Sequence, residues 1–162
     1  MGTGKVLVAD SSPDDRALAL TFSGHGREVE AVDSFHGALS RISRQEELSY
    51  DAIVIDIFID RQESKPLRPD NDIESAIFLG LIAAREGIAR VIVFTQTDEL
   101  PAAARAFCAV VNPQGSHNPI PLNINGAQMW IINPLHVRQH PNELSEGASC
   151  KNWEAIFSRL SR

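Results

Sequence analysis

The sequence contains few cysteines and has no excess of basic charge. Its two cysteines, Cys108 and Cys150, are too few for a disulfide framework and suit a reducing compartment. Fifteen Lys and Arg residues against 21 Asp and Glu residues give a net charge of −6, which argues against nucleic acid or an anionic membrane as partner. There is no apolar run of about 20 residues, the length of a membrane span, and no signal peptide pattern at the start. We therefore expect a cytoplasmic protein.

What the sequence does contain is typical of one globular domain. Its length of 162 residues suits a single domain covering 1–162 and lets the chain bury roughly 70% of its unfolded surface without a disulfide or metal. Hydrophobic residues make up 43% and charged residues 22%, both ordinary values for a globular protein.

Short apolar runs alternate with amphipathic segments along the chain. The helical segments begin at Pro13, after a capping Ser12, and continue with 35–44, 73–85, 99–110 and 153–160. Alternating buried strands and helices predict an α/β fold with a single doubly wound parallel sheet of five strands, in the order 2-1-3-4-5. The predicted strands are 5–9, 28–32, 50–55, 91–94 and 129–132. Segments 60–71 and 112–125, polar or rich in proline, are predicted to be loop insertions.

Polar residues follow four of the five predicted strands. Asp10, Asp56, Thr95 and Asn133 come directly at the strand ends, and the carboxyl ends of parallel strands meet at one edge of the sheet. Two carboxylates beside a hydroxyl at such an edge are able to hold a divalent cation or to accept a phosphoryl group. The simpler interpretation is that strand ends are polar because the chain meets water there.

Four segments carry a resemblance to a known family. They are the strand and acid at 6–13, the strand ending in Asp56 at 51–56, the strand and hydroxyl at 91–95, and the Gly-Ala, aromatic and Asn-Pro residues at 126–134. In order and spacing they resemble the receiver domain of bacterial response regulators, over nearly the whole chain. The resemblance implies a flavodoxin-like receiver fold.

The resemblance also implies a role for individual residues. Asp56 would be the phosphoacceptor, Thr95 the switch hydroxyl and Trp130 the switch aromatic residue. A magnesium ion would be held by Asp10, by Asp56 and by the backbone carbonyl of Phe58, and would neutralise charge during phosphoryl transfer.

Two departures from the family pattern weaken this site. Ser11 stands where the family has a second acid, and Asn133 stands at the lysine position. Magnesium relies on charged oxygen ligands, so its binding should be weak. Loss of the ammonium removes a charge-assisted hydrogen bond worth roughly 1.5–3 kcal/mol. The pattern therefore resembles a degenerate, pseudo-receiver variant.

These departures lead to two alternatives for the function. The first is a stand-alone receiver-like signalling domain of the two-component phosphorelay type, which acts by contact with a protein partner, either a kinase or a downstream effector. The second is a working response regulator that is phosphorylated on Asp56 despite a weakened magnesium site. A homodimer is compatible with both. An enzyme is not expected, because the sequence has no Ser-His-Asp order, nucleophile elbow or nucleotide fingerprint.

Other chemical patterns have simpler explanations. The Gly-Lys pattern at 2–5 precedes a strand instead of following it, unlike a phosphate-binding loop. His136 and His140 have no evident third metal ligand. Asp14 and Asp15 are candidates for the missing acid, but we interpret them as charges that stabilise a helix start.

Overall fold

The computed structural model describes residues 4–24, 26–56, 69–94, 121–132 and 151–160, with only the backbone described at 69–74. These residues form one sheet with the strand order β2-β1-β3-β4-β6-β5, in which every neighbouring pair except β5–β6 is parallel. The strands are β1 (Gly4–Ala9), β2 (Arg27–Val32), β3 (Ala52–Asp56), β4 (Arg90–Phe94), β5 (Leu122–Ile124) and β6 (Ala127–Ile132).

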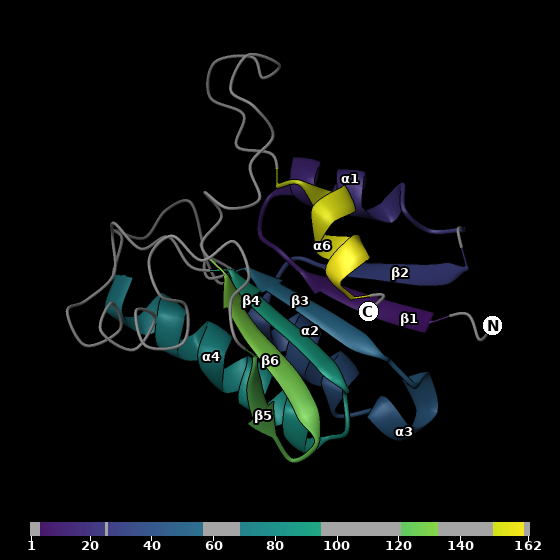
Figure 1. Ribbon diagram of the computed structural model, residues 1–162. Helices are drawn as coiled ribbons and strands as arrows, with labels where there is room; N and C mark the ends of the chain where they lie inside the picture. Colours follow the sequence, from purple (N-terminus) through teal and green to yellow (C-terminus); the bar gives the residue numbers. More distant parts are fainter. Residues whose placement is uncertain (1–3, 25, 57–68, 95–120, 133–150, 161–162) are drawn as a thin grey trace.

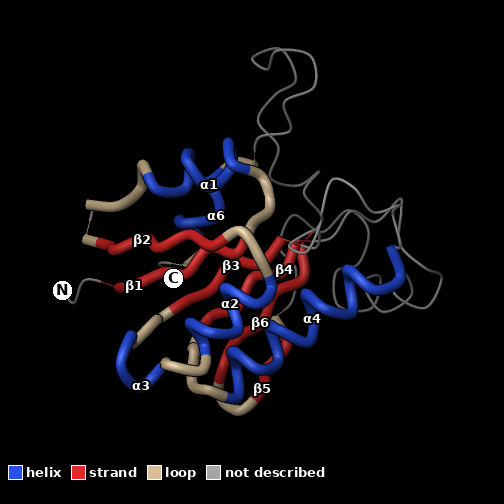
Figure 2. The backbone as a smooth tube through the Cα atoms, turned by 180° about the vertical axis from the view of Figure 1, so that it is seen from behind, coloured by secondary structure: helices blue, strands red, loops and turns tan. Residues whose placement is uncertain are grey.

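Helices cover both faces of the sheet (Figures 1 and 2). Helices α1 and α6 lie together on one face, and α2 and α4 cover the other, while the short α3 lies beyond the start of β3. None of the helices in the described part of the chain is long and apolar enough to cross a membrane. The helices are α1 (Pro13–Leu20), α2 (Phe35–Ile42), α3 (Gln45–Leu48), α4 (Pro69–Arg85) and α6 (Trp153–Arg159).

Strand side chains alternate between two hydrophobic cores, as the pleat of a sheet requires. Leu7, Ile53 and Val91 point into the core beneath α2 and α4. Val8, Val54 and Ile92 point into the core beneath α1 and α6. Because both faces are buried, the strands are continuous apolar runs, which explains why they were visible in the sequence.

The prediction of an all-parallel sheet of five strands is wrong, because the sheet has a sixth, antiparallel strand. The five parallel strands keep the predicted order, but β5 lies within the expected loop 112–125 and pairs with β6. Asn125 and Gly126 join the two strands with φ angles of 50° and 83°. Positive φ at both residues of a two-residue loop is the geometry of a type I′ hairpin, for which Asn-Gly is the preferred sequence.

Several helix boundaries also differ from the predictions. Helix α4 begins at Pro69, so the expected loop 60–71 is helical at its end. A proline in the first turn, followed by acids, is typical of a helix start. The predicted segment 35–44 is shorter, ending at Ile42, and is followed by the unpredicted α3. The predicted helix 99–110 lies outside the described residues.

Gly80 allows α4 to lie close against the sheet. A Cβ atom at this position would lie 2.9 Å from Met129 Cε, 3.1 Å from Val91 Cγ1 and 3.3 Å from Val93 Cγ2. We expect Gly80→Val to lower the free energy of unfolding by about 1–3 kcal/mol, measured by urea denaturation, because the added methyl groups overpack this contact. Intrinsic helix propensity alone would favour valine over glycine.

The matched control for this substitution is Leu81→Val. Leu81 is the next residue of α4 and is 40% exposed, so a valine there should cost only a few tenths of a kcal/mol. If Gly80→Val is neutral or stabilising, close packing at Gly80 is not what limits this position.

Candidate functional site

Two predicted site residues, Asp10 and Asp56, meet at the carboxyl edge of the sheet. Asp56 is the last residue of β3, and Asp10 directly follows β1. The two strands are parallel neighbours, with Ala9 paired to Ile55. Because Ala9 and Ile55 point toward α2 and α4, the residues that follow them point toward the other face, where α1 and α6 lie.

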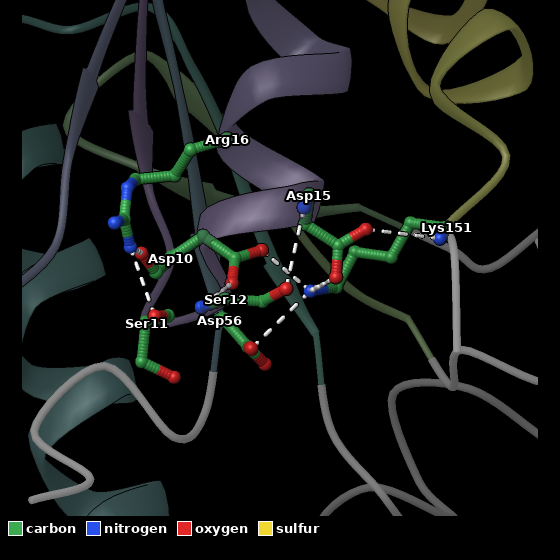
Figure 3. Close-up of polar contacts among 7 residues, drawn as sticks. All are labelled: Asp10, Ser11, Ser12, Asp15, Arg16, Asp56 and Lys151. Carbon is green, nitrogen blue, oxygen red and sulfur yellow. Dashed lines mark hydrogen bonds and ion pairs between the residues drawn. The ribbon is translucent and has the colours of Figure 1, made fainter. Parts of the chain in front are cut away.

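A buried lysine joins these two carboxylates to a third. Lys151 Nζ lies 2.5 Å from Asp10 Oδ2, 3.2 Å from Asp56 Oδ2 and 3.5 Å from Asp15 Oδ2 (Figure 3). The lysine side chain is only 8% exposed. We call Asp10, Asp15, Asp56 and Lys151 the acidic cluster.

The start of α1 brings Asp15 into this cluster. Ser12 caps the helix, and its hydroxyl accepts a hydrogen bond from the Asp15 backbone N–H at 3.2 Å. The Ser12 backbone N–H in turn donates to Asp10 Oδ1 at 2.9 Å. Asp15 Oδ1 accepts the backbone N–H of Lys151 at 3.2 Å. Our interpretation of Asp15 as a helix-start charge was therefore incomplete, because its buried carboxylate also pairs with a lysine.

Arg16 holds the backbone next to the cluster. Its Nη1 donates to the carbonyl oxygens of Asp10 at 2.7 Å and of Ser11 at 2.9 Å. The guanidinium thereby fixes the turn between β1 and α1 without pairing with a cluster carboxylate in the contacts that the structure describes. This turn sets the positions of Asp10 and Asp15 relative to each other.

Burial and neighbouring charge shift the protonation of the cluster. Burial raises the pKa of Asp10 from 3.8 to about 6, and the charge of Asp56 adds to the rise, whereas the ammonium of Lys151 opposes it. Burial by itself would lower the pKa of Lys151, but the carboxylates of Asp56, Asp10 and Asp15 raise that pKa above its ordinary value. Lys151 is therefore a permanent cation at physiological pH.

The remaining predicted site residues either have no contact with the acidic cluster that the structure describes or lie outside the described residues. Ser11 offers its carbonyl oxygen to Arg16. Trp130 is buried in the core beneath α1 and α6, paired with Ile92 across β4 and β6. The other predicted site residues, Phe58, Thr95 and Asn133, lie outside the described residues, as do His136 and His140, which we did not assign to a metal site.

The cluster as it stands does not fit a magnesium ion. Within the described ranges, no group of three or more His, Cys, Asp or Glu side chains is arranged to hold a metal. The three cluster carboxylates each direct one oxygen at the ammonium of Lys151 instead. The point where these oxygens converge already holds a positive charge.

Sequence reasoning missed Lys151, the residue that organises the site. It is one of only three lysines in the chain and is separated from Asp10 by 141 positions. A weak signal exists: Lys151 directly precedes Asn152, which caps α6 through a hydrogen bond from the Ala155 backbone N–H. That signal places Lys151 at a helix start but does not say where the helix packs.

Comparison with known proteins gives no match to any family model, to any curated protein or to any solved structure.

Proposed function

We propose that this chain is a receiver-like signalling domain of the two-component type, which acts through contacts with a protein partner and does not depend on phosphorylation. The observation that carries the proposal is the ammonium of Lys151, buried among the carboxylates of Asp10, Asp15 and Asp56. The parallel strand order and the adjacency of Asp10 and Asp56 at one edge support the receiver-like part.

The chemistry of phosphoryl transfer explains why this arrangement disfavours a reaction. An aspartate that attacks phosphorus needs a free carboxylate oxygen and a divalent cation to neutralise the transferred group. One of the two carboxylate oxygens of Asp56, Oδ2, accepts a hydrogen bond from Lys151 at 3.2 Å, so an ammonium lies where the reaction needs a divalent cation. Withdrawing that buried ammonium would leave uncompensated carboxylates, which is costly.

The second candidate function is a working phosphoacceptor, and one observation favours it. Three carboxylates and one ammonium are the charges that the family resemblance implies, and the sequence lacks an acid at Ser11 and a lysine at Asn133. Asp15 and Lys151 would supply them from other positions. Asp56 is also the most exposed of the three carboxylates, at 12%.

Intact mass spectrometry after incubation with a small phosphodonor and magnesium separates the two candidates. We expect no gain of a phosphoryl group by the natural chain, while a conventional receiver treated in parallel shows that the donor is active. The second candidate requires a gain by the natural chain that is lost in both Asp56→Asn and Lys151→Met, since it needs both the nucleophile and the ammonium.

The contact part of the proposal is tested with the same Asp56→Asn variant. A protein partner recovered on the natural chain should bind Asp56→Asn with an unchanged Kd, because the substitution preserves shape while it removes the nucleophile, and Lys151 keeps the carboxylates of Asp10 and Asp15 as counter-charges. Binding that needs the phosphodonor and disappears in Asp56→Asn would replace this proposal with the second candidate.

A further inference from the structure

Within the acidic cluster, every N–H donor of the Lys151 ammonium has a carboxylate partner. An ammonium has three N–H donors, and the three carboxylates offer one oxygen each, at 2.5, 3.2 and 3.5 Å. The same Nζ bridges Asp10 Oδ2 and Asp56 Oδ2, which come from neighbouring strands. A metal ion that bridged the same two oxygens would have to displace it.

The position of this ammonium is coupled to the docking of α6. The carboxylate of Asp15 accepts two hydrogen bonds from Lys151, one from the lysine backbone N–H and one from the lysine ammonium. Trp153, two residues after Lys151, is the first residue of α6 and is buried in the core beneath α1 and α6. Phe157 stacks on Phe22, with ring centroids 5.0 Å apart. The helix therefore docks onto the sheet at the same place where its leading lysine enters the cluster.

We propose that Lys151 is a built-in cation that stands in for a divalent ion at this edge, so that the docking of α6 takes the place of metal binding. The inference rests on the proposed function and deepens it, because it names Lys151 as the group that holds the carboxyl edge of the sheet in a single conformation. It follows that removal of the ammonium should free the carboxylates of Asp10, Asp15 and Asp56 to rearrange around a divalent cation, which their present arrangement around Lys151 does not hold.

Isothermal titration calorimetry with magnesium chloride tests this consequence. We expect no saturable binding by the natural chain and one-to-one binding by Lys151→Met, with a Kd at least about tenfold below the highest magnesium concentration at which the natural chain shows no binding. The gain should vanish in Lys151→Met combined with Asp56→Asn. The matched control is Lys5→Met, which removes a lysine that pairs with Glu28 and Glu30 outside the cluster.

Hydrogen exchange of the backbone amides provides a readout for the helix. In Lys151→Met without magnesium, exchange in 152–160 should be faster than in the natural chain, while β1 and β3 remain protected. If Lys151→Met does not fold without magnesium, the double variant Asp15→Asn with Lys151→Gln keeps the test open. That variant leaves two carboxylates, whose charge one divalent ion balances, and it should bind magnesium.

Two results would overturn the inference. One is a natural chain that binds magnesium as tightly as Lys151→Met, and the other is a folded Lys151 variant that gains no binding. Failure of the inference can be told apart from failure of the proposed function. A natural chain that gains a phosphoryl group refutes the proposed function whatever the metal titration shows, whereas an unphosphorylated chain with no uncovered metal site refutes only the inference.

Discussion

Replacing Lys151 by methionine should lower the free energy of unfolding by about 3–5 kcal/mol at neutral pH. Removing one partner of a buried ion pair leaves an uncompensated buried charge, and penalties of this size are typical. Here Asp10, Asp15 and Asp56 would all lose the same counter-charge. Because small domains are stable by only about 5–15 kcal/mol, the loss should be plain in urea denaturation followed by circular dichroism.

Lys5→Met is the control for this measurement. Lys5 Nζ lies 3.1 Å from Glu28 and 3.5 Å from Glu30, and the Glu28 side chain is 64% exposed. The side chains of Lys5 and Glu30 are 17% and 27% exposed, and ion pairs that water still reaches contribute about 1 kcal/mol or less, so Lys5→Met should cost much less than Lys151→Met. Equal losses in the two variants would mean that the acidic cluster is no more important to stability than an ordinary surface pair.

The stability contribution of Asp10 should fall as the pH rises from about 4 to 7. The folded-state pKa of Asp10 is about 6 and its ordinary value is 3.8, so between these values the folded state holds a proton that the unfolded state releases. The stabilisation from this bound proton is fully present below the ordinary pKa of 3.8 and is lost as the pH rises through the folded-state pKa of about 6. The rise corresponds to roughly 3 kcal/mol, at about 1.4 kcal/mol per pKa unit.

The comparison that isolates this effect is with Asp10→Asn, which keeps the size of the side chain and cannot titrate. The unfolding free energies of the natural chain and of the variant are measured across this pH range. As the pH rises from about 4 to 7, the natural chain should lose about 3 kcal/mol relative to the variant. A constant difference would show that Asp10 titrates at its ordinary pKa in the folded protein.

The parts of the fold that could be predicted are those with local signals. The buried strands are apolar runs, and Asp10 and Asp56 were found because each comes at a strand end. The hairpin from β5 to β6 also had a local signal, Asn125-Gly126, but we assigned Gly126 to the receiver motif and placed Asn125 in a loop. One residue pair therefore supported two interpretations, and the turn geometry decides between them.

The completed site could not be predicted, because its contacts depend on how distant segments pack. Asp15 in the first turn of a helix has the same sequence signature whether it faces water or a buried lysine. Lys151 reaches Asp10 only because α6 packs beside α1 on one face of the sheet. No spacing in the sequence encodes that placement. The sequence therefore showed that an acid is absent at Ser11 and a lysine at Asn133, but not that Asp15 and Lys151 bring these charges to the site.

The separation between Lys151 and its partners also affects how the protein folds. Asp10 and Asp56 lie 141 and 95 positions before Lys151. During synthesis the segments of β1 and β3 emerge long before that lysine. Until it arrives, the carboxylates of Asp10 and Asp56 must therefore stay hydrated or protonated. Closing such a long loop is entropically costly, which favours late insertion. Interactions formed after the transition state mainly slow unfolding, so Lys151 should govern how long the native state lasts more than how fast it forms.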